Sequence, residues 1–336
     1  MLVLDDYQDV ARTLAPWNEL AAIPELADLT LDVRTSHLDA GELKAALSSA
    51  DVVVAMRERT PLPREVLEQA PNLKLLVTTG MRNASIDIEA CRARGIEVRG
   101  TEGLRTSTAE LTWGLILALG RQICAEDRGV RDGGWQRTIG FELSGARLGV
   151  IGLGNLGAAV ARIGMAFGMN VVAWSQNLTA ERAAEVGVAR VEKEQLLSTS
   201  DIVSLHLKLS GRTAGVIGAT ELALMKPTAY LINTSRGPLV DEAALIAVLR
   251  EGRIGGAGLD VYSVEPLSRS AHPMRALFDR DNVILFPHLT FFTREAMRRL
   301  EDDTLARCFE ILDGRPVTIR SNDPRLRAQT SGVLFR

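Results

Sequence analysis

The chain has 336 residues, which is enough for two domains that each bury a core of their own. Its formal net charge of −3 gives no electrostatic reason to expect a nucleic acid or a membrane surface as a partner. The three cysteines, Cys91, Cys124 and Cys308, lie far apart without CxxC spacing, so we expect reduced thiols and no disulfides. No cluster of His, Cys or acidic residues has the spacing of metal ligands, and we expect no metal.

The beginning of the sequence shows no targeting signal. Met1 leads directly into a strand-like run at residues 2–4, which leaves no room for a signal peptide. The longest apolar stretch, residues 111–119, is too short to span a bilayer. We therefore expect a cytoplasmic protein.

The first hundred residues alternate between strand-like and helix-like segments. Short apolar runs predict buried strands at residues 2–4, 29–33, 52–55, 75–78 and 96–98. The spacing of apolar residues predicts helices between them, at residues 10–20, 40–50, 64–68 and 86–94. Such alternation predicts a small parallel sheet with helices on both faces.

A long apolar helix is expected next. Residues 107–110 have the pattern of a capping box, which predicts a helix that runs from Thr108 to about Cys124. Because this helix is very apolar for a surface element, we expect it to be buried between two domains. Its apolar surface also predicts a two-fold homodimer built around this region. A looser stretch that contains several glycines, residues 128–144, leads to the second half of the chain.

A second alternating series fills most of the remaining sequence. It predicts strands near residues 147–151, 170–174, 202–207, 229–233, 256–261 and 283–286, with helices that begin near residues 155, 179, 192, 219 and 241. This is the pattern of a six-stranded, doubly wound sheet. Residues 293–313 are expected to form a closing helix, and the tail beyond is polar.

The first strand of this series runs into a G-x-G-x-x-G fingerprint, Gly152-Leu-Gly154-Asn155-Leu156-Gly157. Gly152 permits a tight turn, Gly154 lets the backbone approach a pyrophosphate, and Gly157 lets the next helix press against the strand. The N–H groups at the start of that helix, including those of Asn155 and Leu156, are expected to bind the phosphates. A glycine-rich core turn is the simpler alternative, but the strand before and the helix after the fingerprint favour dinucleotide binding.

Three later strand ends carry residues with useful chemistry. Arg236 follows one strand, Glu265 lies just beyond the next, and His288 follows the last. Ligands of open α/β sheets collect at the carboxyl ends of the strands, so these side chains could converge on one cleft. A carboxylate beside an imidazole raises its pKa and orients it as a proton donor, and an arginine binds a carboxylate through its planar fork. Taken singly, each residue also has a purely structural or solvated alternative.

These stretches together resemble the D-isomer-specific 2-hydroxyacid dehydrogenase family. The matches occur in the family's order and extend from Leu2 to about Val317; they are the fingerprint, Met225-Lys-Pro227, Asn233 to Glu242, Asp260 to Pro266, and Pro287-His288. The resemblance implies an α/β protein of two doubly wound parallel-sheet domains. The substrate domain, residues 1–100 and 288–336, would be flavodoxin-like and discontinuous, and residues 101–287 would form a Rossmann NAD-binding domain.

The resemblance also implies roles for individual residues. Arg236 would bind the carboxylate and carbonyl of the substrate, and Glu265 would be the partner of the acid/base His288. The residues expected to bind the cofactor, besides those of the fingerprint, are Thr108, Ser175, Leu207, Thr234 and Asp260. In the substrate domain, the loop Thr79-Gly-Met81-Arg82 would hold the substrate carboxylate through backbone N–H groups. Arg57 would lie near the end of the substrate remote from that carboxylate, although a solvated surface arginine is the simpler alternative.

Three departures from the family pattern concern specificity. Many relatives have an acidic residue for the adenosine ribose where this chain has Ser175, and no arginine for a 2′-phosphate is adjacent. We therefore expect NAD as cofactor, with weak discrimination against NADP. Lys208 stands where relatives often have proline. After His288 relatives often have two glycines, whereas this chain has Leu289-Thr-Phe291-Phe292, and the two phenylalanines are expected to form an apolar wall near the substrate.

The sequence thus predicts an NAD(P)-dependent D-2-hydroxyacid dehydrogenase, or 2-keto acid reductase, that acts on a small-molecule substrate. His288 would deliver a proton to the developing alkoxide while Arg236 stabilises the charge. A formate dehydrogenase is disfavoured, because those relatives pair the histidine with an amide rather than with a carboxylate such as Glu265. A non-enzymatic NAD-sensing protein that resembles the family's corepressors remains as the alternative from another class.

Overall fold

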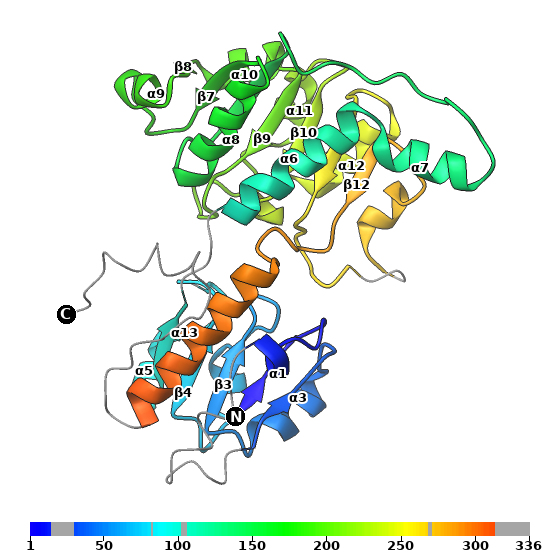
Figure 1. Ribbon diagram of the computed structural model, residues 1–336. Helices are drawn as coiled ribbons and strands as arrows, with labels where there is room; N and C mark the ends of the chain where they lie inside the picture. Colours follow the sequence, from blue (N-terminus) through cyan, green and yellow to red (C-terminus); the bar gives the residue numbers. More distant parts are fainter. Residues whose placement is uncertain (15–29, 82, 102–105, 268–270, 313–336) are drawn as a thin grey trace. The chain divides into compact units, whose positions relative to one another are not determined.

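The computed structural model describes residues 1–14, 30–81, 83–101, 106–267 and 271–312. The chain forms two compact units, which are described separately below (Figure 1). Unit 1 comprises Met1–Leu104 and Arg294–Arg336, and unit 2 comprises Arg105–Thr293. Both boundaries lie slightly later in the sequence than the expected ones, so His288 and the aromatic residues after it belong to unit 2.

Unit 1 is built on a five-stranded parallel sheet. The strands are β1 (Leu2–Val3), β2 (Asp32–Val33), β3 (Val52–Ala55), β4 (Leu75–Thr78) and β5 (Glu97–Gly100), in the order β2-β1-β3-β4-β5. This is the flavodoxin-like order, with the strand reversal between β1 and β3. The central strands β3 and β4 are buried along their whole length, which explains their continuous apolar sequences.

Helices cover both faces of this sheet. On one face lie α3 (Ala40–Leu47), α4 (Arg64–Leu67) and α5 (Ile88–Ala93), whose apolar side chains share a core with Leu76 and Val53. On the other face α1 (Ala11–Leu14) and α13 (Arg294–Leu312) contribute Ala11, Leu305 and Cys308 to a second core. The C-terminal helix α13 therefore returns the chain to the sheet at which it began.

Unit 2 is built on a seven-stranded parallel sheet in the order β12-β11-β10-β9-β6-β7-β8. The strands are β6 (Arg147–Ile151), β7 (Asn170–Trp174), β8 (Ala189–Arg190), β9 (Ile202–Leu205), β10 (Tyr230–Asn233), β11 (Gly256–Leu259) and β12 (Val283–Leu285). The expected six-stranded pattern is confirmed, with the edge strand β8 as an addition. Its two exposed residues carry no apolar pattern that could have predicted it.

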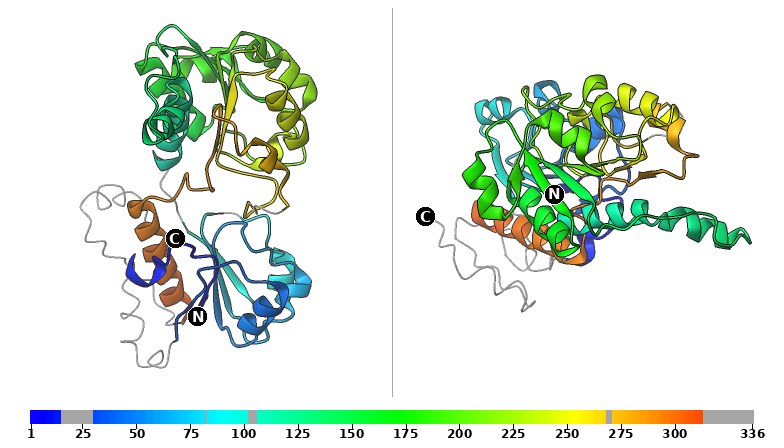
Figure 2. Two further views of the ribbon diagram at one scale, coloured as in Figure 1. Left: turned by 90° about the vertical axis from the view of Figure 1, so that its right-hand side faces the viewer. Right: turned by 90° about the horizontal axis from the view of Figure 1, so that it is seen from above.

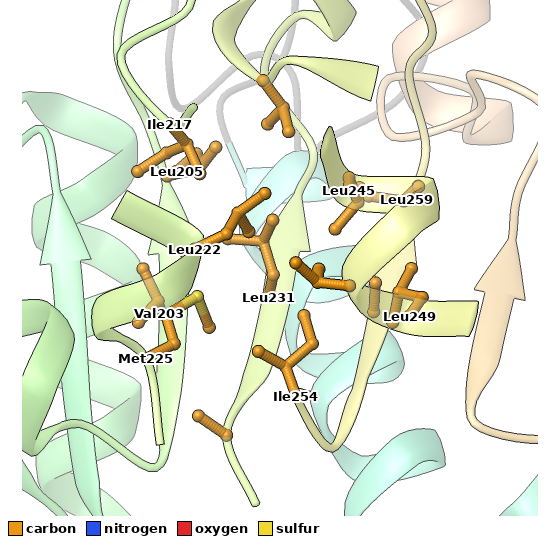
Figure 3. Close-up of a cluster of buried hydrophobic side chains, with 14 of the residues drawn as sticks. Val203, Leu205, Ile217, Leu222, Met225, Leu231, Leu245, Leu249, Ile254 and Leu259 are labelled. Carbon is orange, nitrogen blue, oxygen red and sulfur yellow. The ribbon is translucent and has the colours of Figure 1, made fainter. Parts of the chain in front are cut away.

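Each face of this sheet is covered by its own set of helices. One face packs against α6 (Thr106–Gly120), α8 (Asn155–Ala166) and α9 (Ala180–Val186). The opposite face packs against α10 (Lys193–Thr199), α11 (Ala219–Leu224), α12 (Glu242–Arg250) and the short helices η2 (Gly237–Leu239) and η3 (Pro273–Leu277). Figure 3 shows this second core, in which Leu231 of β10 lies among Leu222, Leu245 and Leu249 of the covering helices.

The apolar helix expected at residues 108–124 differs from the observed one. Helix α6 begins at Thr106, before the predicted cap Ser107, and ends at Gly120, whose carbonyl accepts the N–H of Phe141. Gln122 then has a left-handed φ of 53°, and the separate helix α7 (Ile123–Arg131) occupies part of the stretch expected to be loose. The apolar residues of α6 are buried against α8, β10 and β11 of unit 2 itself, and the expected burial between two domains stays a prediction.

Candidate active site

The fingerprint loop connects β6 to α8 with three glycines in three different environments. Gly152 has a φ of +101°, and a Cβ on it would lie 2.7 Å from the carbonyl carbon and oxygen of His206, so only glycine fits. A Cβ on Gly157 would overlap the carbonyl of Gly152, which lets α8 start directly against the strand. Gly154 is exposed and a Cβ on it would meet nothing within 4 Å. The space beside Gly154 is therefore open on the side from which a pyrophosphate would approach.

The first turn of α8 provides the groups that bind an anion. Gly154 is its N-cap and supplies no side-chain acceptor, and no acidic residue lies in the first turn. The N–H groups of the first turn, at Asn155, Leu156 and Gly157, are thus left for an external acceptor at the positive end of a helix of 12 residues. These residues fit the pyrophosphate of a dinucleotide.

The other residues expected to bind the cofactor lie around this loop. Ser175, half-exposed, follows β7, and its carbonyl accepts the N–H of Leu178 in a turn. Leu207 follows β9 and packs half-buried against the core of unit 2. Thr234 is buried at the end of β10, and its Oγ1 lies 2.8 Å from that of Thr112.

Thr112 and His206 were not expected at the site. The hydroxyl of Thr112 donates to the carbonyl of Thr108 one turn earlier in α6, at 2.7 Å, so Thr234 is the donor to Thr112. The spacing of Thr108 and Thr112 by one helical turn is a signal that could have indicated this contact. His206 lies beside Gly152, with Nε2 2.9 Å from Ser204 Oγ, and burial lowers the pKa of its imidazole to about 4. Its ring is therefore neutral near pH 7.

Arg236 is presented by a turn that follows β10. The buried Asn233 organises this turn, since its Oδ1 accepts the N–H of Ser235 at 3.1 Å and its Nδ2 donates to the carbonyl of Arg236 at 2.9 Å. The next residue, Gly237, lies so close to the backbone of Tyr262 that a Cβ would overlap it. The turn that carries Arg236 is thus pressed against the loop that follows β11.

Glu265 lies on that loop, and both of its carboxylate oxygens are engaged. Oε1 accepts the N–H of Tyr262 at 3.0 Å, and Oε2 lies 2.6 Å from Nδ1 of His288. The side chains of Glu265 and His288 are 21% and 12% exposed, so the pair is mostly screened from water. The carboxylate favours a proton on Nδ1, so Nε2 of His288 is the ring nitrogen that faces away from Glu265.

His288 has a left-handed φ of 53°, an unusual conformation for a non-glycine residue, and its neighbours hold it there. The fully buried carboxylate of Asp260 accepts the N–H groups of Leu289 at 2.8 Å and Thr290 at 3.1 Å. Burial raises the pKa of Asp260, while these N–H groups and the nearby His288 act in the opposite direction. In the structure Asp260 fixes the histidine loop, and the expected contact with the nicotinamide remains a prediction.

Three aromatic residues complete this part of the site. The hydroxyl of the buried Tyr262 reaches the carbonyl of Phe286 at 2.9 Å, which joins the loops that carry Glu265 and His288. Phe291 is 4% exposed, and its ring meets the imidazole of His288 edge-on, with centroids 5.7 Å apart. Phe292 packs on Phe291, with centroids 4.8 Å apart. Phe291 thus supports the imidazole of His288 from the side.

The loop expected to hold the substrate carboxylate lies at the end of β4 in unit 1. The N–H of Thr79 donates to the carbonyl of Ala55, and that of Gly80 to Thr101 Oγ1, both at 3.0 Å, so these two groups serve the fold. Among the described residues, the N–H of Met81 has no acceptor, and its side chain is 68% exposed. Arg82 lies outside the described residues.

Arg57 belongs to the neighbouring loop after β3. Its guanidinium lies against Gly80 so closely that a Cβ on Gly80 would overlap Nη1. Arg57 is therefore placed beside the loop expected to bind the carboxylate, rather than away from it.

Comparisons with known proteins agree with this geometry. The family model of the NAD-binding domain of D-isomer specific 2-hydroxyacid dehydrogenases matches residues 113–290. The glyoxylate reductase of Thermococcus litoralis is 38% identical over 291 residues, which are 84% of this chain and 86% of that protein. The structure of phosphoglycerate oxidoreductase from Vibrio cholerae O395 has a TM-score of 0.84 and 31% identity, and the match covers 94% of this chain and 99% of that chain.

A structure of D-lactate dehydrogenase from Aquifex aeolicus, complexed with NAD and lactic acid, has a TM-score of 0.76 at 28% identity and covers 94% of this chain and 96% of that chain. The alternative of a non-enzymatic binding protein receives no support from these comparisons. Within the described ranges, no helix combines the length and the apolar character that crossing a membrane requires. The chain belongs to the D-isomer specific 2-hydroxyacid dehydrogenases and is a nicotinamide-dependent oxidoreductase that transfers a hydride between its cofactor and a 2-keto or 2-hydroxy acid.

Proposed function

We propose that the enzyme reduces small 2-keto acids, with His288 as the proton donor, Glu265 as its partner and Arg236 as the residue that binds the substrate carbonyl. The observation that carries this proposal is the 2.6 Å contact between Glu265 and His288, which lies at the same sheet edge as the fingerprint loop. Relatives named glyoxylate reductase and hydroxypyruvate reductase support a substrate of this size.

The proposed mechanism assigns one task to each residue. The fingerprint loop would hold the pyrophosphate of the dinucleotide, and its reduced nicotinamide would supply the hydride for the carbonyl carbon. Nε2 of His288 delivers a proton to the carbonyl oxygen as negative charge develops there, and Glu265 stabilises the imidazolium before the transfer. The guanidinium of Arg236 polarises the carbonyl and stabilises the alkoxide. The N–H of Met81 and the guanidinium of Arg57 bind the substrate carboxylate.

We infer that NAD is the cofactor and that discrimination against NADP is weak. The residues after β7 are Ser175, Gln176 and Asn177. They include no carboxylate that would bind the ribose diol of NAD and repel the 2′-phosphate of NADP. They also include no cation that would bind that 2′-phosphate. The side chains of Gln176 and Asn177 are exposed, so neutral hydrogen-bonding groups face the solvent at this strand end.

We also infer a homodimer, built on the segment that includes α7. Four large apolar side chains are exposed along this segment, with exposed fractions of 52% for Ile123, 52% for Val130, 77% for Trp135 and 98% for Ile139. Figure 2 shows that α7 extends away from the rest of unit 2. An exposed apolar extension of this kind is typical of an interface between subunits.

The test of the proposed function is turnover of a panel of 2-keto acids, namely glyoxylate, hydroxypyruvate and pyruvate, with NADH or NADPH. We expect reduction of at least one of them, and we expect His288→Asn to lower kcat by about a hundredfold or more, because general acid catalysis is lost. The KM for NADH should change little, since the fingerprint loop is untouched. No turnover of any member by the wild type would favour the binding-protein alternative, and near-normal kcat in His288→Asn would make His288 a structural residue.

A further inference from the structure

A buried aspartate in unit 1 is surrounded by hydrogen-bond partners that the proposed mechanism does not use. Asp5 follows β1, its φ is 59°, and the residue is 1% exposed. Thr60 Oγ1 donates to its Oδ2 at 2.6 Å, the hydroxyl of Tyr7 donates to its Oδ1 at 3.1 Å, and Nδ1 of His37 lies 3.0 Å from the same Oδ1. The backbone carbonyl of Asp5 accepts Nη1 of Arg59 at 2.8 Å. A buried carboxylate is tolerated only with such partners.

Two of these partners, Arg59 and Thr60, lie in the loop that follows β3. Both are buried, and the guanidinium of Arg59 also stacks on the ring of Tyr7, 4.6 Å from its centroid. The loop is thus fastened to Asp5 through one bond to the carboxylate and one to the backbone. His37, whose side chain is 38% exposed, and the half-buried Tyr7 are the members of the cluster that reach the surface.

The same loop carries Arg57, whose conformation is unfavourable unless its neighbours maintain it. Its φ of 56° is left-handed, which a residue with a Cβ rarely adopts. The N–H of Arg57 donates to Thr79 Oγ1 at 2.9 Å, and Nδ2 of Asn83 donates to its carbonyl. These contacts hold the loop so that the guanidinium lies against Gly80.

We propose that Asp5 is a positioning residue for substrate binding, which holds the loop of residues 57–60 so that the guanidinium of Arg57 stays over Gly80. This inference rests on the proposed function, in which Arg57 and Met81 bind the substrate carboxylate. The side chain of Asp5 accepts hydrogen bonds from two hydroxyl groups, one on each carboxylate oxygen. The isosteric asparagine has one acceptor oxygen and one NH₂ group in the same space, so it cannot receive both hydroxyls.

The test is a double-mutant cycle with Asp5→Asn and Arg57→Ala. We expect Asp5→Asn to raise the KM for the best 2-keto acid about tenfold and to leave kcat and the KM for NADH nearly unchanged, because a charge-assisted contact to the loop is lost. We expect Arg57→Ala to raise the same KM at least as much. In the Arg57→Ala background, Asp5→Asn should have no further effect, because Asp5 acts through Arg57.

Two companion variants keep the test decisive. Thr60→Val removes the hydroxyl that donates to Asp5 and should give the same KM effect, so it replaces Asp5→Asn if that variant does not fold. Asp51→Asn makes the same chemical change at an exposed residue paired with Lys74 and should alter none of the constants.

The outcomes separate this inference from the proposed function. If Arg57→Ala raises KM while Asp5→Asn and Thr60→Val are silent, Asp5 has no positioning role although the substrate loop does bind. If the effects of Asp5→Asn and Arg57→Ala multiply, Asp5 acts on general stability and the inference is overturned. If Arg57→Ala leaves the KM for the 2-keto acid unchanged, the loop does not bind the substrate. If the wild type reduces no 2-keto acid, both the proposed function and this inference are wrong.

Discussion

Gly237 contacts the backbone of Tyr262 so closely that no side chain fits between them. This contact joins the turn that carries Arg236 to the loop that carries Glu265. Tyr262 extends the connection, since its N–H donates to Glu265 and its hydroxyl to the carbonyl of Phe286, two residues before His288. The three residues proposed for catalysis therefore depend on one point of close packing, at which glycine is the only residue that fits.

Replacing Gly237 by alanine should separate these loops. The added methyl group would overlap backbone atoms, which cannot rotate away as a flexible side chain could. We expect kcat/KM to fall by about a hundredfold and Tm to fall by on the order of 5 °C. The matched control is Gly211→Ala, where a Cβ would meet nothing within 4 Å, and it should change neither value. Full activity in Gly237→Ala would show that the two loops are positioned independently.

The placement of Arg236, Glu265 and His288 could be predicted from the sequence, because parallel strands end at a common edge and each residue lies in the loop that follows a strand. The contacts that hold these residues in place could not be predicted from the sequence. The approach of Gly237 to Tyr262 leaves no side-chain pattern, and the left-handed conformations of Arg57 and His288 oppose their intrinsic preferences. Such conformations are imposed by tertiary hydrogen bonds, for example those of Asp260 to the loop after His288.

The surroundings of the apolar helix α6 could not be predicted from the sequence either. The sequence pattern correctly indicated a buried helix near residue 108, but a one-dimensional pattern does not show which surface buries it. The structure buries α6 within unit 2 and leaves the apolar residues of the following segment, such as Trp135 and Ile139, exposed. The carbonyl of Gly120 is capped by Phe141, which lies far along the chain, so the end of the helix could not be read locally.

Cofactor binding can be tested at the second glycine of the fingerprint. Gly154→Ala adds a methyl group in open space, so the variant should fold with an unchanged Tm. The same methyl group would occupy the approach of the pyrophosphate, and we expect the KM for NADH to rise at least about tenfold. Gly211→Ala again serves as the control with neither effect. An unchanged KM for NADH in Gly154→Ala would mean that the pyrophosphate does not approach this glycine.

Cofactor choice is expected to respond to the residue after β7. In the wild type we expect kcat/KM for NADH and NADPH to differ by no more than about tenfold, or 1.4 kcal/mol. Ser175→Asp should shift the ratio toward NADH, because a carboxylate binds the ribose hydroxyls and repels a 2′-phosphate. Ser198→Asp, on the exposed side of α10, is a control for the added charge. Strict dependence of the wild type on NADPH would contradict this account of Ser175.

The proposed homodimer can be tested by removing the exposed apolar side chains near α7. Wild-type protein should have a dimeric mass in light scattering at micromolar concentration. The double variant Trp135→Ser, Ile139→Ser should shift toward the monomer, because it removes two of the largest exposed apolar groups of the segment. Val264→Ser, at an exposed apolar residue elsewhere in unit 2, should remain dimeric. A monomeric wild type would refute the homodimer.

The pH dependence of the free energy of unfolding should be governed by two buried acidic residues of unit 1. Glu301 of α13 and Asp6, which follows β1, are 1% and 0% exposed. Among the described residues, Oε2 of Glu301 and Oδ1 of Asp6 have no hydrogen-bond partner. Burial, with the nearby carboxylates of Asp6 and Asp302, raises the pKa of Glu301 from its usual 4.5 to about 8. Glu301 is therefore protonated in the folded protein at neutral pH.

The direction in which the free energy of unfolding changes with pH follows from the protons bound by the folded and unfolded protein. Between pH 4.5 and 8 the folded protein holds a proton on Glu301 that the unfolded chain releases, so the free energy of unfolding falls as pH rises through this range. Glu301→Gln cannot ionise and should lose this dependence. We expect its Tm to exceed that of the wild type by several degrees at pH 8, since a few kcal/mol are at stake, and to match it at pH 4.5. The exposed Glu68→Gln is the control. A constant difference between Glu301→Gln and wild type across this range would show that folding does not shift the pKa of Glu301 and that its burial is offset by other interactions.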